Sequence, residues 1–128
     1  MFRLADVYLM YAESVARGGQ GGSMATAVQY INALRQRAYG DTAHGVTEAW
    51  LTENNYCNIL DERCRELYWE GTRRTDLVRY GLFTSANYLW TFKGGVLSGA
   101  GVSGRYNVFP IPTTDLSVNA NLKQNEGY

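Results

Sequence analysis

The stretch that decides the fold is residues 3–40, RLADVYLMYAESVARGGQGGSMATAVQYINALRQRAYG, which holds two amphipathic patterns separated by a glycine-rich turn. In both halves the apolar residues recur with the 3.6-residue period of an α-helix. The pattern predicts one helix over residues 2–17 and a second over 24–39, with Ser23 as its N-cap and Gly40 just beyond its end. Two helices joined by so short a turn are expected to pack antiparallel as a hairpin.

This helical hairpin, residues 2–39, cannot bury both of its faces by itself. It therefore resembles one unit of a tetratricopeptide-like stack, in which neighbouring units cover each other. The first pattern also begins almost at residue 1, with no capping residue before it. Both observations predict that Met1 is the start of a fragment, with further helical units upstream, so the missing signal peptide says little about localisation.

After an expected loop at residues 41–51, a charged pattern predicts one long helix over residues 53–80, capped by Thr52 and kinked at Gly71. Several of its charges fall close to its apolar stripe, where they need partners. The spacings predict three ion pairs, which are Arg63 with Glu66, Glu70 with Arg74, and Asp76 with Arg79. We interpret these residues as a structural network rather than as catalytic groups, because losing one buried partner costs about 3–5 kcal/mol.

Composition excludes several functional classes. The formal net charge is zero, from 12 basic and 12 acidic side chains, which argues against a nucleic-acid partner. No apolar run approaches the roughly 20 residues that a membrane-spanning helix needs. Cys57 and Cys64 are seven residues apart in the helical pattern, about 10.5 Å, so both are expected to remain thiols. With His44 as the sole histidine, no metal site and no cofactor are predicted.

The last third of the chain, residues 82–128, is expected to be irregular, because Gly, Ser and Pro interrupt it. The sequence GAGVSG at residues 99–104 matches a dinucleotide-binding fingerprint in its glycines, but it has no strand before it and no helix after it. We interpret it as a flexible loop. Residues 106–109 are predicted to be extended, and a helical turn is expected to start at Thr113 or Thr114.

Aromatic side chains are the candidate ligand contacts, because a flat aromatic ring complements the C–H face of a sugar. Trp90 and Tyr88 lie in a loop-like stretch and are the better candidates, and Tyr56 is a weaker one. Tyr68 and Trp69 fall in the long helical pattern and are expected to pack against other residues.

Five motifs in order resemble the carboxy-terminal part of the SusD/RagB family of Bacteroidetes outer-membrane nutrient-binding lipoproteins. They are RLADVYLMYAES, AVQYINALRQRA, LDERCRELYWEGTRRTDLVRYG, FPIPTTDL and NANLKQNEGY, and they span nearly the whole chain. The charged third motif is the most specific. The sequence departs from the family pattern at Cys64, Thr75, Ala120 and Glu126.

The resemblance implies a mainly α protein built on tetratricopeptide-like hairpins and held at the outer membrane by an N-terminal lipid outside this chain. Such proteins capture glycans or peptides at the cell surface, without chemistry on the ligand and without a cofactor, and pass them to a TonB-dependent transporter of the SusC type. The resemblance also implies that much of the ligand site lies in parts of the protein outside this sequence. No binding residue of the family is therefore carried over.

Two alternatives remain open. The first is a freestanding tetratricopeptide-like adaptor that binds a protein partner through the exposed side of the hairpin. The second is an enzyme that uses the carboxylates of the charged helix, and its weakness is that those carboxylates have arginines at pairing distance.

Overall fold

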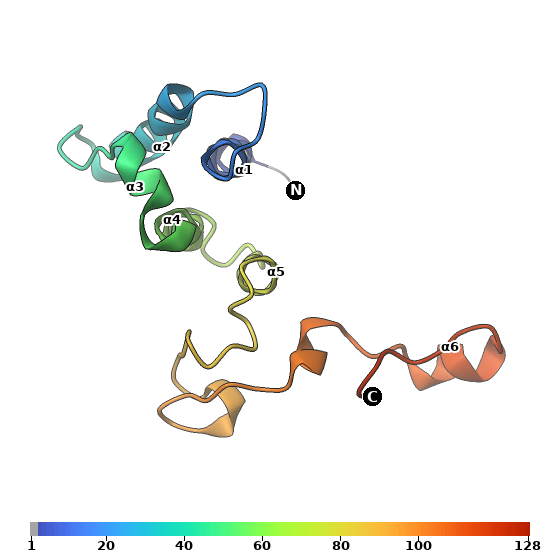
Figure 1. Cartoon of the computed structure of the whole chain (residues 1–128). Coiled ribbons are helices and arrows are strands. Elements are labelled where there is room, and N and C mark those ends of the chain that lie inside the picture. Colours follow the sequence, from blue (N-terminus) through green and yellow to red (C-terminus); the bar gives the residue numbers. More distant parts are fainter. Residues whose placement is uncertain (1–2) are drawn as a thin grey trace. The chain divides into compact units, whose positions relative to one another are not determined.

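A computed structural model describes residues 3–128 of the chain (Figure 1). Phe2, where the first helix was expected to begin, lies outside the described residues. The observed elements, in chain order, are α1 (Leu4–Ala16), α2 (Met24–Tyr39), α3 (Glu48–Thr52), η1 (Glu53–Tyr56), α4 (Cys57–Glu66), α5 (Arg73–Arg79), η2 (Lys93–Gly95), η3 (Gly104–Asn107) and α6 (Thr113–Val118). No strand occurs within residues 3–128, so the prediction of a mainly α fold is confirmed.

The chain divides into two compact units at Thr72. The part up to Thr72, here called the helical unit, contains α1 to α4. The part from Arg73 to Tyr128, here called the loop unit, contains α5, α6 and long connections with short 3₁₀ turns. Each unit is described by itself.

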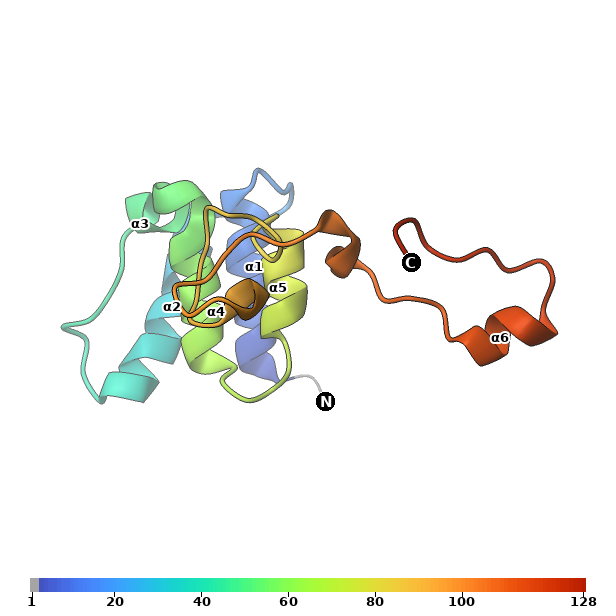
Figure 2. The same ribbon diagram turned by 90° about the horizontal axis from the view of Figure 1, so that it is seen from below.

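The helices α1 and α2 form the predicted antiparallel hairpin (Figure 2). Near the turn, the Tyr11 hydroxyl accepts a hydrogen bond of 3.0 Å from the backbone N–H of Ser23. At the opposite end, Arg3 and Arg37 both bind Glu66, which places the start of α1 beside the end of α2. Between these ends the rings of Tyr8 and Tyr30 stack with centroids 4.1 Å apart.

The caps of α2 follow the sequence prediction. The Ser23 side chain accepts from the Thr26 backbone N–H at 3.1 Å, which satisfies one of the donors left unpaired at a helix start. Gly40 has φ = 80°, the left-handed conformation in which glycine ends a helix without steric cost.

The core of the helical unit is a single apolar cluster contributed by α1, α2, α3 and α4. Its buried members are Ala5, Leu9, Ala12, Ala27, Ile31, Leu34, Leu51, Ile59 and Leu67. Leu51 belongs to α3 and Ile59 to α4, so these two helices cover the face of the hairpin that its own helices leave open.

The prediction of one long helix over residues 53–80 is wrong. Helix α3 starts inside the expected loop, at Glu48, and Thr52 ends it instead of capping a later helix. Asn54 and Asn55 then adopt left-handed conformations, with φ of 52° and 51°, so the chain turns before α4 begins. Asparagine tolerates this conformation better than most residues, which explains why an apparently helical pattern breaks here.

A second interruption separates α4 from α5. Leu67 has left the helical region as the C-cap of α4, and both Trp69 and Gly71 have positive φ, 67° and 75°. The expected kink at Gly71 is therefore a complete break. A glycine at a left-handed position ends a helix readily because it carries no Cβ.

The loop unit is held by side-chain-to-backbone bonds that sequence periodicity does not reveal. The amide group of Gln124 bonds both backbone groups of Ile111, at 2.8 and 2.9 Å, so the tail returns to the segment before α6. Residues 106–109 were predicted to be extended, but η3 covers 104–107 and only the end of this segment is extended. Helix α6 starts at Thr113, as predicted.

Within residues 3–128, no helix combines the length and the apolar character that crossing a bilayer requires.

Candidate functional site

The acidic side chains at the end of α4 and in the following turn bind arginines from the hairpin. The Arg3 guanidinium donates to Glu66 at 3.0 Å and to both carboxylate oxygens of Glu70, at 2.9 and 3.1 Å. Arg37 also donates to Glu66, at 2.6 Å. These bonds raise the pKa of Arg3 and, chiefly through the hydrogen bond from Arg3, lower the pKa of Glu70.

Two further pairs of α4 also link elements that are distant in sequence, and a third lies within the helix. Arg63 of α4 donates to Asp6 of α1 at 2.9 Å, with exposed side-chain fractions of 6% and 15%. Glu62 accepts from Arg35 of α2 and from Arg65 of its own helix, both at 2.7 Å. A buried pair of this kind resists separation because either partner alone is costly in a low-dielectric interior.

The partners expected within one long helix are thus partly replaced. Glu70 binds Arg3, and Arg74 donates to the backbone oxygen of Tyr106 at 2.7 Å. The Glu70–Arg74 pair assumed a continuous helix, and the break after α4 removes that geometry. Asp76 and Arg79 do pair, at 2.7 Å within α5.

The charged residues of the helical unit therefore brace it. Each acidic side chain described above has a guanidinium within 3.0 Å, and a carboxylate so engaged is a poor general base. No group of three His, Cys, Asp or Glu side chains suited to a metal ion occurs among residues 3–128.

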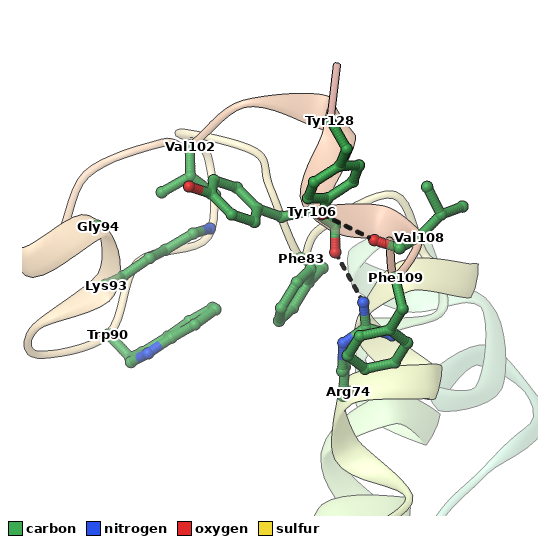
Figure 3. Close-up of a pocket in the computed structure, with 10 residues that line it drawn as sticks. All are labelled: Arg74, Phe83, Trp90, Lys93, Gly94, Val102, Tyr106, Val108, Phe109 and Tyr128. Atoms are coloured by element: carbon green, nitrogen blue, oxygen red, sulfur yellow. Dashed lines mark hydrogen bonds between the residues drawn. The ribbon is translucent and has the colours of Figure 1, made fainter. Parts of the chain in front are cut away.

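The loop unit contains an open cavity of about 470 Å³, here called the aromatic hollow (Figure 3). Its aromatic and basic lining residues are Arg74, Phe83, Trp90, Lys93, Tyr106, Phe109 and Tyr128. They come from α5, from η2 and the loops flanking it, from the segment around η3 and from the last residue of the chain, so the hollow depends on these segments being held together.

Arg74 lies at one end of the hollow, between two phenylalanine rings (Figure 3). Its guanidinium carbon is 4.9 Å from the centroid of Phe83 and 4.1 Å from that of Phe109. A cation stacked on an aromatic face keeps its N–H groups in the plane of the guanidinium, directed past the rings. One of them reaches the backbone oxygen of Tyr106.

Lys93 lines the hollow and binds the backbone of the loop before η2. Its buried ammonium group donates to the backbone oxygens of Leu82 at 3.2 Å and Tyr88 at 2.6 Å, and also to that of Ser85. It lies 4.6 Å from the Trp90 ring centroid. Burial lowers the pKa of Lys93, because desolvation disfavours the charged form.

Comparison with known proteins identifies the relationship. The family model described as the SusD family matches residues 1–128. The chain belongs to the SusD family. The chain is 46% identical, over its whole length, to "Starch-binding protein SusD" of Bacteroides thetaiotaomicron and 35% identical to "SusD-like protein P25" of Formosa agariphila. It spans 21% and 24% of the length of these relatives.

In this SusD-family chain, the three predicted ligand contacts have different surroundings. Trp90 lines the hollow and is 39% exposed. Tyr88 lies just beside it, with its hydroxyl accepting a short hydrogen bond from Arg73 and its backbone oxygen bound to Lys93. Tyr56 belongs to the helical unit, where the Arg17 guanidinium covers its ring at 4.6 Å.

Sequence reasoning missed most of the hollow and misjudged two aromatics. A long irregular segment separates Phe83 from Tyr106 and Phe109, and no periodic signal relates the three residues. Their common feature in sequence is that each is an aromatic residue within residues 82–128, the part of the chain expected to be irregular. The expectation that Tyr68 and Trp69 pack is wrong for the described chain, because both are exposed, Trp69 by 90%.

Proposed function

We propose that the protein containing this chain binds nutrient glycans at the bacterial cell surface. The observation that carries the proposal is the 46% identity, across the whole chain, to a protein named for starch binding. The chain corresponds to 21% of that relative, so the proposal concerns a protein of which this chain supplies one part.

We further propose that the protein is lipid-anchored at the outer membrane and delivers its ligand to a TonB-dependent transporter of the SusC type. It performs no chemistry on the ligand. The support from the chain itself is that the carboxylates of α4 are engaged by arginines, so they are positioned to brace helices rather than to activate water.

Within this assignment the two units have different roles. The helical unit is a scaffold, and the loop unit exposes aromatic rings to which sugar can bind. Trp90 and Tyr88 of the loop unit are the contacts we expect. Tyr56 is a weaker candidate, because it lies in the helical unit and the Arg17 guanidinium covers its ring. Exposed aromatic side chains favour a glycan over a peptide. A sugar binds by stacking its C–H groups on an aromatic ring, and this stacking does not require hydrogen bonds to a peptide backbone.

The test is calorimetric titration of the full-length protein with neutral glycans, acidic glycans and peptides. Saturable binding of at least one glycan, with the sugar recovered unchanged, is the expected result. Binding of peptides alone, or shortening of the sugar, would contradict the proposal. Failure to bind any glycan together with capture of a defined protein partner would support the adaptor alternative.

Two variants, Trp90→Ala and Trp69→Ala, test the role of Trp90 in glycan binding. Trp90→Ala should weaken glycan binding, because it removes a ring of the hollow, whereas Trp69→Ala removes an equally large, exposed ring that does not line the hollow. Stacking on one aromatic ring contributes on the order of 1 kcal/mol, so we expect a loss of about fivefold. Equal affinities of the two variants would exclude Trp90 as a contact.

A further inference from the structure

We infer that the aromatic hollow receives an acidic sugar ring, with the carboxylate of the sugar at Arg74. This inference rests on the proposed function and specifies a site and a ligand class for it. Four observations support it.

The first observation is the environment of Arg74. Within the loop unit, no carboxylate lies within ion-pair distance of its guanidinium, whose contacts are the Tyr106 backbone oxygen and the two phenylalanine rings. A guanidinium carries five N–H donors, and the bond to Tyr106 uses one. By contrast, Arg79 on the same helix pairs with Asp76. Arg74 therefore keeps both its charge and a planar set of donors, which suits bidentate recognition of a carboxylate.

The second observation is the charge around the hollow. Its lining includes two basic side chains and no acidic one. The loop unit as a whole carries more basic than acidic side chains, namely Arg73, Arg74, Arg79, Lys93, Arg105 and Lys123 against Asp76, Asp115 and Glu126. Charge complementarity therefore favours an anionic ligand over a neutral one.

The third observation is that the two basic residues of the lining, Arg74 and Lys93, have different contacts. The Lys93 ammonium group donates to three backbone oxygens, so its role is to stabilise the loop at residues 82–88. Arg74 is half-buried and lines the other end of the hollow (Figure 3). Of the two lining cations, Arg74 is therefore the one that can bind the anionic group of a ligand, and its position orients the rest of the ligand.

The fourth observation is the shape and exposure of the aromatic lining. Phe109 is 70% exposed, and Trp90 and Tyr106 are also exposed. A volume of about 470 Å³ lies within the range of small-ligand sites, about 300–1,000 Å³. A ligand that combines an apolar ring face with a carboxylate satisfies both the rings and Arg74. A hexuronate residue of an acidic polysaccharide has this combination.

The experiment uses the full-length protein, titrated with an oligogalacturonate, an oligoglucuronate and a neutral malto-oligosaccharide of equal length. The acidic oligosaccharides are expected to bind, and their affinity is expected to fall as salt is added. Arg74→Gln should weaken acidic binding about 10- to 100-fold, because a hydrogen-bonded charge pair is lost. The affinity of Arg74→Lys for the acidic oligosaccharides should lie between those of Arg74→Gln and the unchanged protein, because lysine keeps the charge but loses the bidentate geometry.

Lys123→Gln is the matched control, because it removes one exposed positive charge from the same unit at a residue outside the hollow. Its affinity for the acidic oligosaccharides should equal that of the unchanged protein. If Arg74→Gln and Lys123→Gln bind acidic oligosaccharides equally, or if only the malto-oligosaccharide binds, the inference is overturned while the proposed function stands. If no glycan of any class binds, the proposed function fails and the inference fails with it. Melting curves confirm that each variant is folded.

Discussion

The helical unit and the loop unit are stabilised in different ways, although they belong to one short chain. The helical unit holds the whole apolar cluster and most of the ion pairs between distant elements. The loop unit buries Leu77, Asp76 and Lys93, and it is held by bonds from side chains to backbone oxygens. Apolar packing thus makes a rigid scaffold, and polar ties shape an open cavity. The following variants test that contrast.

The largest effect is expected for Arg63→Ala in the helical unit. This change removes the partner that the half-buried Asp6 has at 2.9 Å, so we expect a loss of about 3 kcal/mol in the free energy of unfolding, the lower end of the cost of breaking a buried pair. Urea denaturation of the full-length protein measures it. Arg65→Ala on the same helix is the control, because Arg65 is exposed and Glu62 keeps Arg35 as a partner. A loss no greater than that of the control would show that the Arg63–Asp6 pair is solvated.

A smaller and more local effect is expected for Lys93→Met in the loop unit. Methionine keeps most of the apolar stem but removes the three bonds to backbone oxygens, each worth about 1 kcal/mol net. Hydrogen exchange should accelerate at the Val102 and Ala100 amides, which bond to Thr84 and Lys93 within this loop. Exchange in α1 and α2 should not change. Acceleration in those two helices would contradict a role of Lys93 confined to the loop unit.

The smallest effect is expected for Glu70→Gln, and it depends on pH. Arg3 lowers the pKa of Glu70 below its ordinary value of 4.5, so the stabilisation from this pair is complete above that pH and is lost as pH falls through the lowered pKa. The melting temperature of the unchanged protein should therefore exceed that of Glu70→Gln at neutral pH, and the difference should shrink in acid. A difference that is constant with pH would rule out a role for the Glu70 charge. The exposed fraction of Glu70, 36%, keeps the effect small.

The parts of the fold that were predictable from sequence are those with a periodic signal. The hairpin, the Ser23 cap and the Gly40 terminus follow from local rules, and the structure has them. The prediction of one helix over residues 53–80 was wrong because Asn54 and Trp69 adopt left-handed conformations, which hydrophobic periodicity does not reveal. The arginine partners of Glu66 and Glu70 come from the hairpin, and sequence spacing reports only neighbours on the same helix.

The candidate site was less predictable than the fold. Trp90 was singled out because it is an aromatic in a loop, and it does line the hollow. Arg74 was assigned to an ion pair on helical spacing, and its position between Phe83 and Phe109 depends on loop geometry far along the chain. A site assembled from loops of irregular length has no periodic signature, so its members become visible only in three dimensions.

The most direct test of the account is hydrogen exchange on the full-length protein with and without the oligosaccharide that binds most tightly. The central claim is that the helical unit is a scaffold and that the loop unit carries the ligand-facing surface of this chain. We expect slower exchange on binding within residues 83–109 and no change in α1 and α2. Slower exchange confined to α1 and α2, with residues 83–109 unaffected, would contradict it.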